Sequence, residues 1–156
     1  MISIKRTNSN DPGFASLVTQ LDNDLFNRYG TAQLEYQPYN IIENLQTVVI
    51  AYSENEPVGC GCFKKLETDT VEVKRMYVMP EQRGKGIGLL LMKELEKWAG
   101  ESGFASIVLE TGSGQPEAIH LYKKQGYSII PNYGQYSGMK ESICMKKNIA
   151  PPLVNK

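Results

Sequence analysis

A glycine-rich stretch in the middle of the chain has the residue types and spacing of a phosphate-binding turn. It reads Arg83-Gly84-Lys85-Gly86-Ile87-Gly88, follows Pro80 at the end of an expected strand, and opens an amphipathic helix. Glycines let the main chain approach a ligand closely, and the N–H groups in the first turn of a helix have no partner within the helix. These donors and the helix dipole suit a phosphate group, to which Arg83 and Lys85 add positive charge.

Two common nucleotide-binding patterns do not fit this turn. The dinucleotide pattern G-x-G-x-x-G needs a third glycine where the chain has Leu89 or Leu91, and no Gly-Lys-Ser/Thr follows at the spacing of a P-loop. The strands before the turn are expected to be antiparallel, so no standard βαβ unit leads into the helix. A nucleotide-dependent enzyme is therefore disfavoured.

The elements that must position the turn follow from the spacing of apolar residues. A helix is expected over 12–28, because Asp11 can cap it and Pro12 suits a first helical position. Strands over 47–52, 58–66 and 70–79 should form an antiparallel meander, since the loops between them are too short for a parallel crossover. The remaining elements are a helix from 83, a strand over 105–110, a helix over 116–125 and strands over 127–130 and 141–145. The order β-α-βββ-α-β-α-ββ predicts an α/β (α+β) fold, a mixed sheet with helices on its faces.

Two motifs together resemble the GNAT superfamily of acetyl-CoA-dependent N-acyltransferases. The family signature Arg/Gln-x-x-Gly-x-Gly/Ala, after a strand ending in a Tyr-Val-x-Pro type turn, is matched without a gap over 83–88. Members then show Asn, Ala three residues on, Tyr four further, and Gly-Phe or Gly-Tyr. This chain has Gln115 in place of Asn, then Ala118, Tyr122 and Gly126-Tyr127. The resemblance covers roughly residues 47 to 147.

The resemblance implies how acetyl-CoA would bind. The family sheet has about six to seven strands, is mostly antiparallel, and splays between its fourth and fifth strands, here 71–78 and 105–110. The pantetheine arm lies in that splay and the pyrophosphate lies on the amides of the glycine-rich turn. Residues that the resemblance implies for acetyl-CoA are Met76, Tyr77, Val78, Arg83, Gly84, Lys85, Gly86, Ile87, Gly88 and Gln115.

Catalytic groups are also implied by position in the motifs. Tyr122 would be the general acid that protonates the leaving thiolate, although its ring could equally pack against the sheet, and both can hold together. An alkyl ammonium must lose a proton before it attacks, and Glu72 on the central strand is a possible general base. The alternative for Glu72 is an ion pair with Lys74 or Arg75.

Tyrosines in the two variable segments suggest where the acceptor amine binds. Tyr29, Tyr39 and Tyr133 could hold a small polar amine through hydrogen bonds and ring faces, or could be ordinary loop tyrosines. Cys60 and Cys62 share one face of a strand, but no second pair or histidine lies at ligand spacing, so we expect core residues and no metal.

Composition limits the partners and the compartment. Lys plus Arg and Asp plus Glu both number 17, so the formal net charge is zero. A chain without net positive charge has no long-range attraction for nucleic acid or an anionic membrane surface. Residues 1–6 lack the apolar core of a signal peptide, and three cysteines cannot pair completely, so we expect a cytoplasmic protein. It could be a monomer or a homodimer.

The chain has the length of one domain and no internal repeat. We expect residues 1–148 to form it and 149–156 to be a short flexible tail, because Pro151 and Pro152 stop any strand there. The resulting prediction is direct acetyl transfer from acetyl-CoA to a primary amine of a small molecule. The alternatives are peptide or protein N-acetylation on the same fold and an acyl-CoA-binding sensor without turnover.

Overall fold

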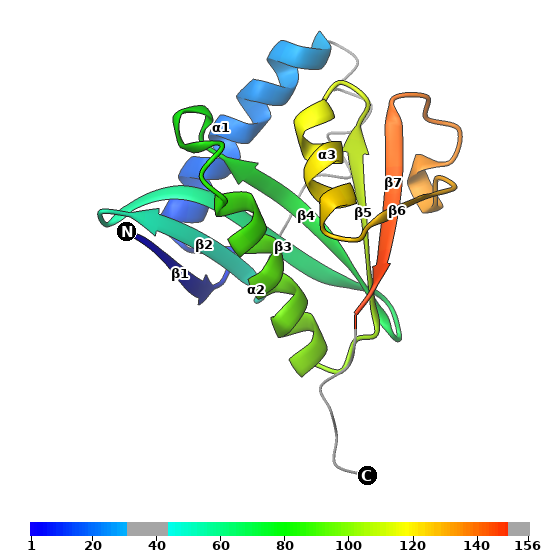
Figure 1. Cartoon of the computed structure of the whole chain (residues 1–156), viewed down its shortest axis with the longest axis horizontal. Helices are drawn as coiled ribbons and strands as arrows, with labels where there is room; N and C mark the ends of the chain where they lie inside the picture. Colours follow the sequence, from blue (N-terminus) through cyan, green and yellow to red (C-terminus); the bar gives the residue numbers. More distant parts are fainter. Residues whose placement is uncertain (31–43, 150–156) are drawn as a thin grey trace.

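The computed structural model describes residues 1–30 and 44–149. Within these residues, seven strands form one open sheet and three helices cover its two faces (Figure 1). The strands are β1 (Ile2–Thr7), β2 (Val48–Ser53), β3 (Glu56–Glu67), β4 (Thr70–Val78), β5 (Ser106–Gly112), β6 (Ser128–Ile130) and β7 (Ser142–Asn148). The helices are α1 (Pro12–Tyr29), α2 (Ile87–Glu101) and α3 (Pro116–Lys124), with single 3-10 turns η3 (Pro80–Gln82) and η4 (Gly134–Tyr136).

The sheet order is β1-β2-β3-β4-β5-β7-β6, and every neighbouring pair is antiparallel except β4 with β5. The predicted meander over β2, β3 and β4 is confirmed, as is the mixed, mostly antiparallel sheet. β4 and β5 are parallel because the crossover between them contains α2, which is long enough to return the chain to the same end of the sheet.

Local sequence signals explain where the helices begin. Asp11 caps α1 as expected, since its Oδ1 accepts a 2.9 Å hydrogen bond from Gly13 N. The second helix was expected from Arg83 but begins at Ile87. Gly84 and Gly86 have φ values of 80° and 81°, so this stretch forms a left-handed turn before the helix instead of its first residues.

Two apolar clusters lie on opposite faces of the sheet. Residues of α2 and α3 pack on one face with side chains of β2, β4 and β5. Residues of α1 pack on the other face against β2 and β3. Ile149, which was expected to begin the tail, is buried in the first cluster and its N–H bonds to Ala105 O at 2.9 Å. The packed part of the chain therefore reaches residue 149, and residues 150–156 lie outside the described part.

The two central strands separate partway along their length. β4 pairs with β5 only from Thr70 with Ser106 to Val73 with Leu109, although β4 continues to Val78 and β5 to Gly112. The predicted splay between the fourth and fifth strands is therefore present. Beyond Val73 and Leu109 the facing main-chain groups of β4 and β5 no longer pair with each other. A ligand can therefore enter the middle of the sheet and bind these groups.

Candidate active site

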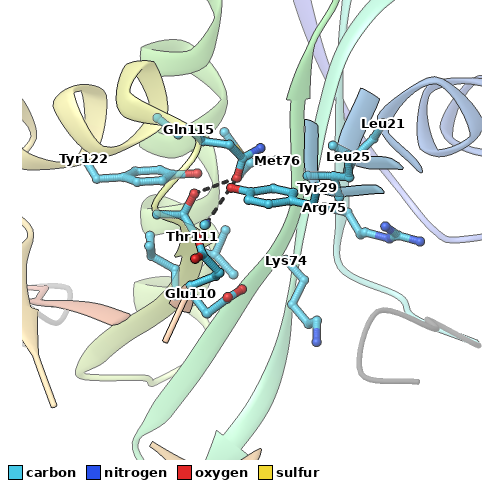
Figure 2. A pocket seen from close by; sticks show the side chains of 15 residues that line it. Leu21, Leu25, Tyr29, Lys74, Arg75, Met76, Glu110, Thr111, Gln115 and Tyr122 are labelled. Atoms are coloured by element: carbon cyan, nitrogen blue, oxygen red, sulfur yellow. Dashed lines mark hydrogen bonds between the residues drawn. The ribbon is translucent and has the colours of Figure 1, made fainter. Parts of the chain in front are cut away.

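Two cavities meet at the splay. The larger offers about 270 Å³ and runs from the splay to the glycine-rich turn, and we call it the turn groove. The smaller offers about 110 Å³ beside the end of α1, and we call it the α1 pocket (Figure 2). Both are lined by Leu21, Met76, Gln115, Ala118 and Tyr122. The two cavities therefore join along one edge of β4 and one face of α3.

The turn groove brings together nine of the ten residues expected to bind acetyl-CoA. The exception is Lys85, which is exposed and donates from Nζ to Gln82 Oε1 at 3.2 Å. Arg83 lies over the Tyr77 ring at 5.7 Å and donates from Nε to Val78 O at 2.9 Å, which ties the turn to the end of β4. No side chain caps the first turn of α2, so its N–H groups remain available to an anion.

Gln115 lies where the groove reaches α3. Its Oε1 accepts from Thr111 Oγ1 at 2.9 Å and from Gly112 N at 3.3 Å, and it does not cap α3 with its side chain. The carboxamide oxygen is thus used to hold the end of β5. The amide NH₂ carries the remaining donors, which a ligand in the groove could use.

A β-bulge interrupts β4 just beyond the splay point. Cys60 pairs with Tyr77 and Cys62 with Lys74, so Arg75 and Met76 together face the single residue Gly61. Arg75 has a φ of 59°, a conformation that costs a residue with a side chain roughly 1–2 kcal/mol. Two hydrogen bonds from its guanidinium to Asp22 on α1, of 2.7 and 3.3 Å, help to hold it there. Bulges often redirect main-chain groups beside active sites.

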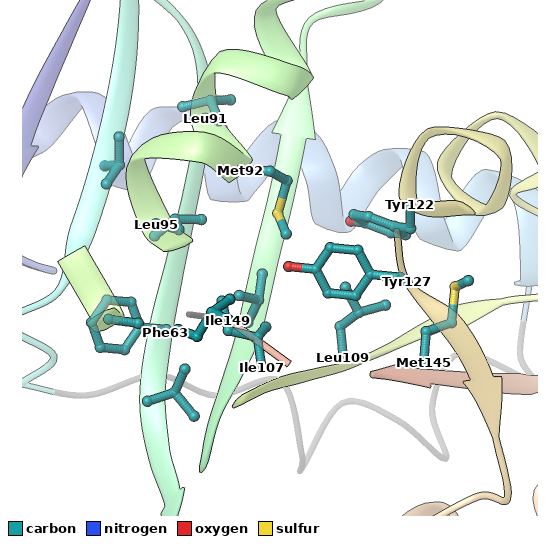
Figure 3. Packing of buried hydrophobic residues seen from close by; sticks show 14 of the residues in the cluster. Phe63, Leu91, Met92, Leu95, Ile107, Leu109, Tyr122, Tyr127, Met145 and Ile149 are labelled. Carbon is teal, nitrogen blue, oxygen red and sulfur yellow. The ribbon is translucent and has the colours of Figure 1, made fainter. Parts of the chain in front are cut away.

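Tyr122 lies at the junction of the two cavities. Figure 2 shows its hydroxyl pointing from α3 into the α1 pocket, toward Thr111 and Gln115. Its ring is buried and packs edge to face on Tyr127, with centroids 5.9 Å apart, as Figure 3 shows. Burial, and then the nearby charge of Glu110, raise the pKa of this phenol, so it stays protonated at neutral pH. The ring packs against its neighbours while the hydroxyl faces the cavity, and the role of Tyr122 as general acid stays a prediction.

Glu72 and Tyr133 are brought together, but neither lines the two cavities. The Tyr133 hydroxyl donates to Glu72 Oε2 at 2.7 Å, while Glu72 Oε1 lies 3.9 Å from Lys74 Nζ and 4.0 Å from Lys64 Nζ. The Glu72 side chain is 1% exposed. Its alternative reading, an ion pair within the sheet, therefore has direct contacts in its favour, and its role as a base stays a prediction.

Glu110 is a candidate that the sequence reading missed. It lines the α1 pocket together with Tyr122, and Figure 2 shows its carboxylate beside the splay, on the side of Lys74. Burial raises its pKa to about 7, an effect increased by Glu72 and opposed by the Ser142 hydroxyl at 2.8 Å and by Lys74. The signal that could have revealed Glu110 is an acidic residue directly after a run of apolar residues in a buried strand.

The end of α1 closes one side of the α1 pocket. The Tyr29 hydroxyl accepts from Gly114 N at 3.0 Å, and a Cβ on Gly112 would collide with the same hydroxyl. Arg28 donates from Nη1 to Gly114 O at 3.0 Å and to Glu117 Oε1 at 2.6 Å. Tyr29 thus lines the α1 pocket, and its role in binding the acceptor stays a prediction. Tyr39 lies outside the described residues.

No group of three or more His, Cys, Asp or Glu side chains in residues 1–30 and 44–149 is arranged to hold a metal ion. All three cysteines are buried free thiols. Within the same described residues, no helix is long and apolar enough to cross a membrane.

The sequence and the fold of this chain are both similar to those of known acetyltransferases. Residues 14–127 match the model of the acetyltransferase (GNAT) family. An IAA acetyltransferase of Azospirillum brasilense is 31% identical over 154 residues, which cover 94% of this chain and 97% of that protein. A Klebsiella pneumoniae protein assigned to the acyl-CoA N-acyltransferases has a similar solved structure, with a TM-score of 0.81, 29% identity, and coverage of 96% and 99%. The chain belongs to the GNAT acetyltransferase family.

Members of this family are acyltransferases, and acetyl-CoA is the co-substrate. The PaiA N-acetyltransferase of Thermoplasma acidophilum, solved with coenzyme A, shares the fold at a TM-score of 0.67 and 18% identity, covering 95% of this chain and 99% of that chain. The turn groove fits such a ligand, because it joins uncapped helix N–H groups and two left-handed glycines to an open strand edge.

Proposed function

We propose that this protein transfers the acetyl group of acetyl-CoA directly to a primary amine of a small molecule. The observation that carries the proposal is the position of Tyr122, whose side chain lines both the turn groove and the α1 pocket. The groove would hold the donor and the pocket the acceptor. A phenol at the junction can donate its proton to the departing sulfur.

The remaining roles belong to groups around the same junction. Main-chain N–H groups at the β4 bulge can stabilise negative charge on the thioester oxygen during attack, an effect typically worth a few kcal/mol. N–H groups between Arg83 and Gly88 would bind the diphosphate. With a pKa of about 7, Glu110 can accept a proton from the acceptor ammonium near neutral pH, and we assign it the base role in preference to Glu72.

A small acceptor is favoured by how the α1 pocket is bounded. Hydrogen bonds that Arg28 donates to Gly114 O and Glu117, and one that the Tyr29 hydroxyl accepts from Gly114 N, close one side of it, whereas an extended peptide would need an open groove. Glu110, Glu141 and Tyr29 line the pocket together with Lys74 and Arg75. The two carboxylates and the phenol suit an ammonium group. An acceptor carrying one or more primary amines fits this lining.

Direct transfer is favoured over a covalent acetyl-enzyme. A cysteine nucleophile must be ionised and reachable. Cys60 and Cys62 are fully buried, and burial raises the pKa of both thiols, that of Cys62 to about 12. The free state of all three thiols also supports a cytoplasmic location for the protein.

The test is thiol release from acetyl-CoA by the purified protein with a panel of acceptors. The panel contains amino acids, polyamines, aminoglycosides and a basic peptide, and also IAA because of the name of the Azospirillum relative. Turnover on a small amine, with a matching mass gain of one acetyl group, supports the proposal. Turnover on the peptide alone favours peptide N-acetylation, and tight acetyl-CoA binding without turnover on any acceptor favours a sensor.

A further inference from the structure

The run Gly59-Cys60-Gly61-Cys62 on β3 has no place in the proposed chemistry, yet Gly61 lies opposite the β4 bulge and the cysteines pair with Tyr77 and Lys74 on either side of it. The Cys60 thiol donates to Arg75 O at 3.4 Å, and the Cys62 thiol donates to Lys74 O at 3.2 Å. Both thiols are fully buried against α1. Two side chains of one strand thus hold two consecutive carbonyl groups of the next.

The direction of these two carbonyl groups also determines the direction of the N–H groups in the same peptide units. In a trans peptide the C=O and the N–H point in opposite directions, and the described residues contain no cis peptide. The Arg75 carbonyl shares its peptide with the Met76 N–H, and the Lys74 carbonyl shares its peptide with the Arg75 N–H. With both carbonyls held by β3, we expect both N–H groups to point away from β3, toward the side on which β4 has separated from β5.

We infer that the thiols of Cys60 and Cys62 are positioning residues that hold the bulge with the N–H groups of Arg75 and Met76 directed into the splay. The inference rests on the proposed function, in which those N–H groups meet the thioester oxygen. The thiols touch neither substrate. They act through the main chain of β4.

Two further observations fit this role. Burial raises the pKa of both thiols, so they remain protonated donors across the physiological range. The alternating glycines leave room for the bulge on the opposite face, because a Cβ on Gly61 would collide with Met76 Sδ, and one on Gly59 would lie 3.1 Å from Tyr77 O. The two cysteines therefore bond to β4, and the two glycines avoid steric clashes with it.

The experiment compares single variants of Cys60 and Cys62 that differ only in volume and in hydrogen-bond donation. Cys→Ala removes the donor, Cys→Val fills the volume without a donor, and Cys→Ser restores a hydroxyl donor. The matched control is Ile50→Val, because Ile50 is buried in the same cluster and pairs directly across from Cys60. Thermal unfolding is measured for each variant, so that only folded samples enter the kinetics.

We expect Cys60→Ala and Cys60→Val to lower kcat about tenfold, a fraction of the roughly 10²–10³ that follows loss of a whole oxyanion donor. The KM for acetyl-CoA should stay within about twofold, because the turn and the groove are unchanged. Cys60→Ser should recover most of the loss, and Ile50→Val should keep the wild-type kcat. Wild-type kcat in the Ala and Val variants, or an equal loss in the Ile50 control, would overturn the inference.

A second measurement keeps this test separate from the proposed function. Calorimetric titration gives the affinities for acetyl-CoA and for coenzyme A, which lacks the thioester oxygen. We expect the preference for acetyl-CoA to fall by about twofold or more in Cys60→Ala and to return in Cys60→Ser. If the wild-type protein acetylates no amine, the proposed function fails, but an unchanged preference in Cys60→Ala would still reject the role of the thiols.

Discussion

The Tyr133 hydroxyl donates a 2.7 Å hydrogen bond to Glu72 Oε2, joining the loop after β6 to the first part of β4. Two residues expected to serve the acceptor separately are therefore partners of each other. Burial and the adjacent Glu72 charge raise the pKa of the Tyr133 phenol, so it remains a donor. Glu72 is therefore bound by Tyr133 and lines neither cavity, whereas Glu110 lines the α1 pocket.

The first prediction concerns this contact. Tyr133→Phe leaves a buried carboxylate oxygen without its donor, which typically costs about 1–3 kcal/mol. Urea unfolding should show a lower midpoint with an unchanged slope. A double-mutant cycle with Glu72→Gln should return a coupling energy well above zero, and additive effects would show that the two side chains do not depend on each other.

The second prediction tests the acid. Tyr122→Phe should lower kcat by about 10²-fold, because general acid catalysis commonly contributes that much, while the KM for acetyl-CoA changes little. The control is Tyr127→Phe. Tyr127 lines neither cavity, and its hydroxyl donates to Glu96 at 2.8 Å. It should lose stability and keep kcat. Equal kcat losses in both variants would point to packing as the role of Tyr122.

The third prediction distinguishes the two glutamates by pH. With a pKa of about 7 for Glu110, kcat/KM should rise with pH through that region and level off above it. Glu110→Gln should remove this rise and lower the plateau by about 10²-fold. Glu72→Gln should keep the rise at the same pH. A rise that survives in Glu110→Gln and disappears in Glu72→Gln would restore the base role to Glu72.

The fourth prediction follows from the same pKa by linkage. Because the folded pKa of Glu110, about 7, lies above the ordinary glutamate value of 4.5, its contribution to stability is complete below pH 4.5 and is lost as the pH rises through 7. Glutamine carries no charge, so Glu110→Gln should be more stable than wild type at pH 8 by roughly 1–3 kcal/mol. The difference should shrink toward pH 4.5. Urea unfolding at pH 4.5 and pH 8 measures it, with Glu67→Gln, at an exposed position of β3, as the control variant.

The fifth prediction compares two left-handed glycines at opposite ends of α2. Gly86 has a φ of 81° in the turn, Gly103 has a φ of 93° just after the helix, and a Cβ at either would meet nothing within 4 Å. Alanine at either should cost about 1–2 kcal/mol of stability. Only Gly86→Ala should raise the KM for acetyl-CoA, by about tenfold or more. A similar rise in Gly103→Ala would show that the turn does not bind the diphosphate.

Local signals predicted the elements well, because each depends on residues close in sequence. Asp11 and Pro12 set the start of α1, and the β-branched run before Tyr52 set β2. The start of α2 was misplaced because Gly84 and Gly86 adopt a left-handed turn that an apolar helical pattern cannot reveal. Ile149 was assigned to a tail because only its distant partner, the Ala105 carbonyl, holds it in the core.

The sequence by itself indicated the family and predicted the acetyl-CoA turn and the role of Tyr122, since these rest on short motifs with fixed spacing. Only the tertiary structure decided which carboxylate faces the cavity. Glu72 and Glu110 are both acidic residues of central strands, and their difference arises from the loop that brings Tyr133 over one and the splay that exposes the other. The raised pKa of Glu110 likewise depends on burial and on Ser142, Lys74 and Glu72, which reach it from two other strands and which no local pattern records.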